Sequence, residues 1–167
     1  YISNHGIDPI LMEQAFAVSK AFFELPEGDK QAVAVDGNQR GWLAKGMSQM
    51  QGSKTHDLKE VFFWGAHTEA DDVDMLARKP LCAVNQWPRD FPRLSEDLTP
   101  YYDAVCLMAR RVMAAVAVSL DQPANFFDKA YAKPLARGQM VYYPASTPQD
   151  ETEVRFGVAP HTDFGVL

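Results

Sequence analysis

The stretch that decides the fold class runs from residue 139 to residue 165 and reads QMVYYPASTPQDETEVRFGVAPHTDFG. It contains two runs rich in β-branched and aromatic residues, Gln139–Tyr143 and Val154–Val158, separated by a polar turn. Such runs favour β-strands. At the end of the stretch, His161 and Asp163 stand two positions apart within apolar sequence. We therefore predict the beginning of a sheet that leads directly into two side chains able to bind a metal.

The sequence before this stretch is mainly helical. Asp8 and Pro9 are typical of a helix start, and apolar residues at helical spacing continue to about Glu24. The clearest helix is predicted over Pro100–Leu120, where one face is apolar. Shorter elements are predicted as a helix at Glu27–Val33 and strands at Arg40–Leu43 and Val61–Trp64. Helices that come first and strands that come later indicate an α+β protein.

Composition excludes several classes of function. The 167 residues fit one domain or a large part of one, and the net charge of −6 disfavours nucleic acid as a partner. No apolar run is long enough for a membrane span. Cys82 and Cys106 are too few for a disulfide framework or a zinc site, which favours a reducing, cytoplasmic setting. Because the chain starts without Met and ends in apolar residues, we expect it to be a piece of a longer enzyme.

The pair His161 and Asp163 suits a metal. In an extended segment, residues i and i+2 point to one face, so imidazole and carboxylate would lie on the same side. Together with a second histidine they would form the facial triad that binds non-haem Fe(II) and leaves positions open. From the residues alone, a solvated surface pair remains the alternative. Upstream, Lys59 and Glu60 are expected to form an ion pair with each other and not an acid–base couple.

Seven segments, in order along the chain, resemble the iron- and 2-oxoglutarate-dependent oxygenases of the isopenicillin N synthase-like family. They are Ile2–Ile7, Phe22–Pro26, Arg40–Trp42, Asp57–Phe62, Asn85–Pro88, Tyr142–Pro144 and His161–Gly165. The resemblance implies N-terminal helices packed on a double-stranded β-helix, or jelly-roll, only part of which lies in this chain. On this basis residues 1–135 are the N-terminal helical and mixed region, and residues 136–167 begin the Fe(II)/2-oxoglutarate jelly-roll domain.

The resemblance also implies roles for individual residues. His161 and Asp163 match the first two iron ligands, and Tyr143 matches the tyrosine that reaches the 2-oxoglutarate carboxylate in many members. Val141 departs from the pattern, since members often have Asn there. The third ligand, a distal histidine, and an Arg-x-Ser pair that clamps the far carboxylate are expected beyond this chain. The remaining histidines lie in the wrong segments to replace that ligand, and they are His5, His56 and His67.

The function implied by the resemblance is that of a dioxygenase. With Fe(II), 2-oxoglutarate and O₂, it would hydroxylate, desaturate or cyclise a small organic molecule and release succinate and CO₂. Three alternatives stay open at this point: an isopenicillin N synthase-like oxidase that does not use 2-oxoglutarate, a catalytically silent metal-binding scaffold, and a domain that binds Zn(II) or Mn(II). The substrate and the oligomeric state do not follow from the sequence.

Overall fold

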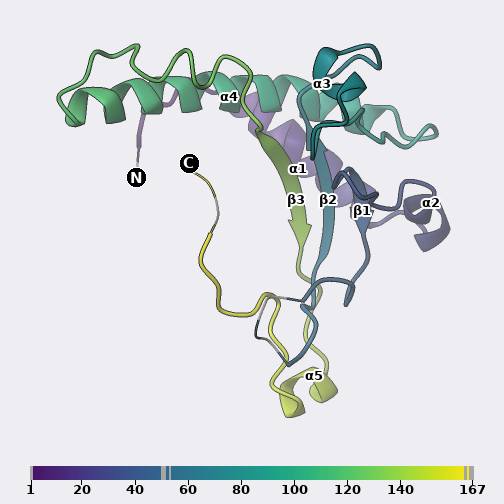
Figure 1. Cartoon of the computed structure of the whole chain (residues 1–167). Coiled ribbons are helices and arrows are strands. Elements are labelled where there is room, and N and C mark those ends of the chain that lie inside the picture. Colours follow the sequence, from purple (N-terminus) through teal and green to yellow (C-terminus); the bar gives the residue numbers. More distant parts are fainter. Residues whose placement is uncertain (1, 50–51, 53, 164, 166–167) are drawn as a thin grey trace. The chain divides into compact units, whose positions relative to one another are not determined.

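The computed structural model of the protein describes residues 2–49, 52, 54–163 and 165, and it is a mixed helix and sheet structure (Figure 1). Its elements are α1 (Pro9–Phe23), α2 (Glu27–Gln31), β1 (Gly41–Leu43), β2 (Glu60–Gly65), α3 (Val73–Leu76), α4 (Arg93–Ser119), β3 (Arg137–Tyr142) and α5 (Pro148–Thr152). The chain forms two compact units, residues 1–22 with 89–136 and residues 23–88 with 137–167. Among the described residues, no helix combines the length and apolarity that crossing a membrane requires.

Helix α1 begins where the sequence predicts. The Asp8 carboxylate accepts a hydrogen bond from the Ile10 amide at 2.9 Å, and the Asp8 carbonyl accepts one from the Leu11 amide at 3.0 Å. These bonds satisfy amide groups that the first helical turn leaves without partners. The apolar stripe is buried at Ala15, Val18 and Phe22. The predicted helix is confirmed, and its end at Phe23 agrees with the stop expected before Pro26.

Helix α4 begins earlier than predicted. The sequence predicts a start at Pro100, but the helix runs over Arg93–Ser119 with Pro100 inside it. An internal proline removes one backbone hydrogen bond and crowds the preceding turn, at a cost of about 3 kcal/mol. Leu94 and Leu98, upstream of the proline, are 0% and 1% exposed. Burial of a leucine side chain contributes roughly 1.5–3 kcal/mol, so the two together offset the proline.

The second unit contains a three-stranded antiparallel sheet in the order β1-β2-β3 (Figure 1). Trp42 of β1 pairs with Phe62 of β2, and Phe62 pairs with Met140 of β3. Phe62 is completely buried, and its ring stacks on that of Trp87 with centroids 5.6 Å apart. The three strands predicted from β-prone runs at residues 40–43, 61–64 and 139–143 are confirmed, with small shifts at their ends.

The expected ion pair between Lys59 and Glu60 is wrong. The Glu60 carboxylate bonds to the buried Lys30 Nζ at 2.9 Å and to the Trp42 indole N–H at 3.0 Å. Lys59 instead pairs with Asp57, at 3.3 Å between Nζ and Oδ2. The physical reason is that adjacent residues of an extended segment point to opposite faces, so Lys59 and Glu60 reach different partners.

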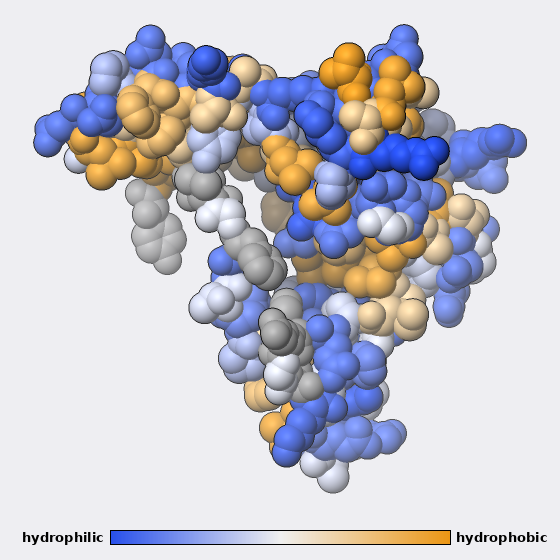
Figure 2. Space-filling view, in the orientation of Figure 1, coloured by the Kyte–Doolittle hydropathy of each residue, from blue (hydrophilic) through white to orange (hydrophobic). Residues whose placement is uncertain are grey.

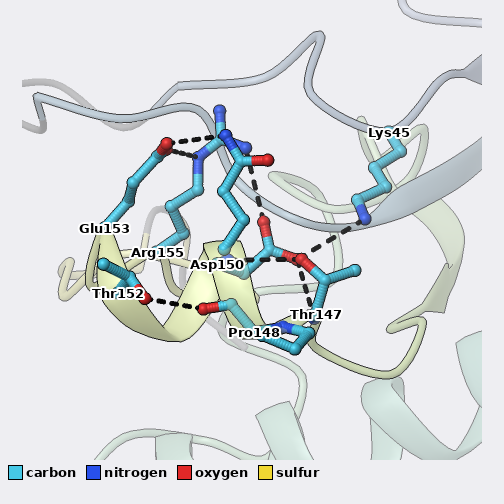
Figure 3. A network of polar contacts seen from close by, with 8 residues as sticks. Lys45, Thr147, Pro148, Asp150, Thr152, Glu153 and Arg155 are labelled. Atoms are coloured by element: carbon cyan, nitrogen blue, oxygen red, sulfur yellow. Dashed lines mark hydrogen bonds and ion pairs between the residues drawn. The ribbon is translucent and has the colours of Figure 1, made fainter.

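The strand predicted at Val154–Val158 is also wrong. The chain forms the short helix α5 and then a series of turns and bends. A capping box starts α5, because the Asp150 carboxylate accepts a bond from the Thr147 amide at 3.0 Å and the Thr147 hydroxyl oxygen accepts one from the Asp150 amide at 3.2 Å (Figure 3). Val154 has a φ of 52°, in the left-handed region, which prevents an extended conformation there.

A polar network surrounds Asp150, which is buried (Figure 3). Bonds from the Thr147 amide and hydroxyl, then from Arg155, with Lys45 nearby, hold the pKa of Asp150 below its usual range despite burial. Arg155 lies 3.3 Å from both Asp150 Oδ1 and Glu153 Oε2. The surface over α5 is mostly hydrophilic (Figure 2). Polar contacts therefore fix the turns that follow α5.

Gly138 offers a test of the sheet. It pairs with Trp64 across β2 and β3, and a Cβ added there would lie 2.4 Å from the Trp64 ring. We expect Gly138→Ala to lower the free energy of unfolding of the full-length protein by about 1–3 kcal/mol, because the indole must move. Urea denaturation measures this loss. Gly28→Ala is the control, since nothing lies within 4 Å of its added Cβ; equal losses in the two variants would contradict the packing.

Candidate metal centre

The structure brings His161 and Asp163 together. His161 Nε2 lies 3.1 Å from Asp163 Oδ1, and the two side chains are 35% and 93% exposed. The residues do lie on one side of the backbone, as predicted, but the segment is irregular and not a strand. Phe164, which follows the pair in the sequence, lies outside the described residues.

A backbone carbonyl orients the imidazole of His161. Its Nδ1 lies 2.9 Å from the Ala159 carbonyl oxygen, which can only accept a hydrogen bond. Since the carbonyl can only accept, Nδ1 is the ring nitrogen that donates to Ala159, and Nε2 is the ring nitrogen that faces Asp163. Histidine ligands of metals use this same arrangement, in which the second ring nitrogen donates to a carbonyl or carboxylate. The two donors thus fit one nitrogen and one oxygen position of a facial Fe(II) site.

The amide of the same residue, Ala159, is held by Asp57. The Asp57 carboxylate is 1% exposed, and its Oδ1 accepts a hydrogen bond from the Ala159 amide at 3.1 Å. Its Oδ2 accepts from the Ser48 hydroxyl at 2.9 Å and pairs with Lys59. Burial alone would raise the pKa of Asp57, but the bonds from Ala159, Ser48 and Lys59 together hold that pKa below its usual range.

Sequence reasoning placed Asp57 in a matching segment but assigned it no role. A signal was present, since an acidic residue directly before a buried strand, with a lysine two positions later, suggests a charged pair on one face. The contact with Ala159 had no local signal, because 102 positions separate the two residues. A further backbone bond, from the Leu58 amide to the Phe156 carbonyl at 3.0 Å, lies beside it.

Tyr143 follows β3 directly and is 51% exposed. Its ring lies against Gly157, since a Cβ added to that glycine would come within 2.7 Å of Tyr143 Cδ1. No hydrogen bond or ion pair between described residues joins Tyr143 to His161 or Asp163. Tyr143 therefore packs on the segment that leads into His161, and its role toward a cosubstrate stays a prediction.

A hollow of about 480 Å³ lies beside this segment. Its described lining residues are Gly52, Lys54, Thr55, Glu153, Val154, Phe156, Ala159 and Pro160. The volume is within the range of sites that bind small molecules. Because Pro160 directly precedes His161, the hollow and the candidate ligands share one stretch of backbone.

The other histidines have different surroundings. His5 Nδ1 accepts a hydrogen bond from the Ile7 amide at 3.1 Å, as expected for a histidine in a turn. His67 pairs with Glu69 at 2.8 Å, and both side chains are about three-quarters exposed. Within the part of the chain that the structure describes, no group of three or more His, Cys, Asp or Glu residues could hold a metal ion. The assignment of His161 and Asp163 as ligands, and of a third ligand beyond them, stays a prediction.

Comparison with known proteins identifies the family. Residues 1–90 match the family model described as the N-terminal part of the non-haem dioxygenase in morphine synthesis, and the chain belongs to this family. The chain is 29% identical over 171 residues to the 2-oxoglutarate-Fe(II) type oxidoreductase of Emericella nidulans, a match that covers 99% of this chain and 49% of that protein. The chain thus spans about half the length of the curated relatives it matches.

Solved structures agree with this assignment. A 2OG-Fe(II) oxygenase family protein from Caulobacter crescentus has a TM-score of 0.73 and 27% identity, covering 87% of this chain and 47% of that one. A full-length Neurospora crassa protein in complex with alpha-KG and thymine has a TM-score of 0.75, covering 95% of this chain and 50% of that one. Its identity of 24% supports the fold alone.

The low pKa of Asp57 predicts how stability depends on pH. Its folded pKa lies below the ordinary 3.8, so its contribution is complete above that value and is lost as pH falls toward the folded pKa. We expect the free energy of unfolding to fall below about pH 4, and Asp57→Asn to be less stable at neutral pH but less sensitive to acid. Urea denaturation at a series of pH values measures both. Parallel curves for wild type and variant would contradict the assignment.

Proposed function

We propose that the protein containing this chain is a non-haem Fe(II)- and 2-oxoglutarate-dependent oxygenase that oxidises a small organic molecule. One observation carries the proposal: in a member of this dioxygenase family, His161 Nε2 and the Asp163 carboxylate lie 3.1 Å apart with the imidazole already oriented by a carbonyl. The names of the relatives support the same class of reaction, since they include 2-oxoglutarate-Fe(II) oxidoreductases and 2-oxoglutarate-dependent dioxygenases.

His161 and Asp163 would hold the iron, together with a third ligand from outside the described residues. Their side chains supply one neutral nitrogen and one charged oxygen, which leaves room for a cosubstrate and O₂. When bound, Fe(II) activates O₂, while 2-oxoglutarate supplies two electrons as it is converted to succinate and CO₂. The nearby hollow of about 480 Å³ has the size for a small-molecule substrate.

Tyr143 would bind the cosubstrate. Its hydroxyl can donate a hydrogen bond to a carboxylate, and the contact of its ring with Gly157 keeps it near the segment before His161. Such a bond to a charged group contributes about 1.5–3 kcal/mol. Val141, which stands where many members have Asn, would leave Tyr143 as the main polar contact from this strand.

The proposal extends to the complete fold. Residues 136–167 would begin a double-stranded β-helix, with residues 1–135 as the N-terminal region. Two findings support this division: the structural similarity to oxygenases along most of the chain, and the position of β3 at the edge of the sheet, where a further strand can pair.

Substitution of the ligands tests the function. In the full-length protein we expect His161→Ala and Asp163→Ala to abolish Fe(II) binding and the substrate-dependent formation of succinate, because each removes one of two adjacent ligands. Anaerobic Fe(II) titration and a succinate assay are the measurements. Production of oxidised substrate without succinate would point instead to an oxidase that does not use 2-oxoglutarate.

The chain offers a matched control for this experiment. His67 and Glu69 form a second histidine–carboxylate pair with the same spacing in sequence. His67→Ala should leave Fe(II) binding and turnover as in wild type, because that pair is highly exposed and belongs to another segment. Unchanged turnover in His161→Ala would overturn the ligand assignment.

Tyr143→Phe tests the proposed cosubstrate contact. Loss of the hydroxyl should raise the KM for 2-oxoglutarate about tenfold or more, with a smaller change in kcat, because a bond to the charged carboxylate is lost. Succinate formation at a series of 2-oxoglutarate concentrations measures both constants. Tyr142→Phe is the neighbouring control, since the ring of Tyr142 stacks on Phe23, with centroids 5.5 Å apart. Equal KM values for the Tyr143 variant and wild type would exclude the contact.

A further inference from the structure

We propose that Asp57 is a positioning residue for the metal ligand His161 and that it acts through the backbone of Ala159. This inference rests on the proposed function, because it concerns the same iron site. It assigns a purpose to a buried carboxylate far from the metal-binding pair in the sequence. Asp57 is not itself proposed as a ligand.

Residue Ala159 is the connection, through the two peptide groups on either side of its Cα. Its N–H donates to Asp57 Oδ1 at 3.1 Å, and its carbonyl lies 2.9 Å from His161 Nδ1. The carboxylate therefore fixes the position of a residue whose carbonyl sets both the tautomer and the orientation of the imidazole. Displacement of Ala159 would turn Nε2 away from the position that it must occupy to bind a metal.

Between the described residues, the hydrogen bonds that join the segment from Phe156 to His161 to a distant part of the sequence are those of Phe156 and Ala159. From Glu153 to Asp163 the described chain forms neither helix nor strand, so no regular ladder of hydrogen bonds holds it. The Leu58–Phe156 backbone bond lies further from His161 than the bond made by Asp57. Ala159 is nevertheless buried, at 6% exposure. The Asp57 carboxylate is thus the nearest described attachment of His161 to the rest of its unit.

Asp57 is itself held in place. Its Oδ2 accepts from the Ser48 hydroxyl at 2.9 Å and lies 3.3 Å from Lys59 Nζ, whose side chain is 13% exposed. Its amide donates to the Ser48 carbonyl at 2.8 Å. With one oxygen fixed by these groups, the other is left to accept from Ala159. This arrangement is that of a rigid support and not of a mobile surface charge.

The test uses the full-length protein and two readouts. Hydrogen exchange of the peptide that contains Ala159 reports the backbone bond, and anaerobic titration with Fe(II) reports the metal site. We expect Asp57→Ala to accelerate exchange at this peptide and to weaken Fe(II) binding 10–100-fold, the usual effect of losing a group that orients a ligand. Asp57→Asn keeps an oxygen that can accept from Ala159, so it should recover most of the affinity.

Asp150→Ala is the matched control. Asp150 is also a buried carboxylate of the same unit, but its bonds go to Thr147 and Arg155. We expect it to lower stability while Fe(II) affinity stays within a few-fold of wild type. The visible spectrum of the Co(II)-loaded protein, which reports ligand geometry, should change in Asp57→Ala and stay as in wild type in Asp150→Ala. A general loss of stability alone would change neither spectrum.

The outcomes separate the two proposals. If wild type binds no Fe(II), or if His161→Ala binds it as tightly as wild type, the proposed function fails. If His161→Ala loses Fe(II) but Asp57→Ala retains wild-type affinity, the role of Asp57 is overturned. If Asp57→Ala does not fold, the variants Asp57→Asn and Ser48→Ala test the inference instead. In these variants, hydrogen-exchange protection of Ala159 and Fe(II) affinity must change together. A folded variant that loses protection of Ala159 but keeps its Fe(II) affinity, or the reverse, contradicts the inference.

Discussion

The buried carboxylate of Asp57 is the constraint on which the candidate site depends. A buried charge is costly unless hydrogen bonds and an opposite charge compensate it. Here Ser48, Lys59 and the Ala159 amide supply that compensation, and the lowered pKa of Asp57 agrees with a group that stays ionised. One of these partners, Ala159, lies two positions before His161 of the candidate metal-binding pair. The hydrogen bond from the Ala159 amide to Asp57 thus both stabilises the buried charge and fixes the backbone before His161.

A partly buried carboxylate in the same segment, Glu60, binds different partners from Asp57. Asp57 and Glu60 flank the start of β2, and their side chains reach different surroundings. Glu60 binds Lys30 and the indole of Trp42, which ties α2 and β1 to the sheet, whereas Asp57 reaches Ala159. Glu60 begins β2, the central strand of the sheet, in which Phe62 is completely buried, and Asp57 lies shortly before it. The alternation of an extended chain makes this division possible.

Prediction from the sequence worked where the determinants are local. The start of α1 at Asp8 and the strands around Trp42 and Phe62 follow from capping residues and β-prone runs, and the structure confirms them. It failed where other interactions override local preference. Pro100 suggested a helix start, but α4 already begins at Arg93, and Leu94 and Leu98 upstream of the proline are buried. The run Val154–Val158 suggested a strand, but it forms turns and bends after α5, with Val154 at a φ of 52°.

The candidate site shows the same limit more sharply. The sequence contains two histidine–carboxylate pairs of equal spacing, His67 with Glu69 and His161 with Asp163, and each pair is in contact. Spacing therefore does not distinguish a ligand pair from a surface ion pair. The distinction lies in what holds the imidazole: His67 is largely exposed, whereas His161 Nδ1 lies 2.9 Å from the carbonyl oxygen of Ala159, and the amide of Ala159 binds Asp57. The contact of Asp57 with Ala159 joins residues 102 positions apart, so the sequence alone does not show this difference between the two pairs.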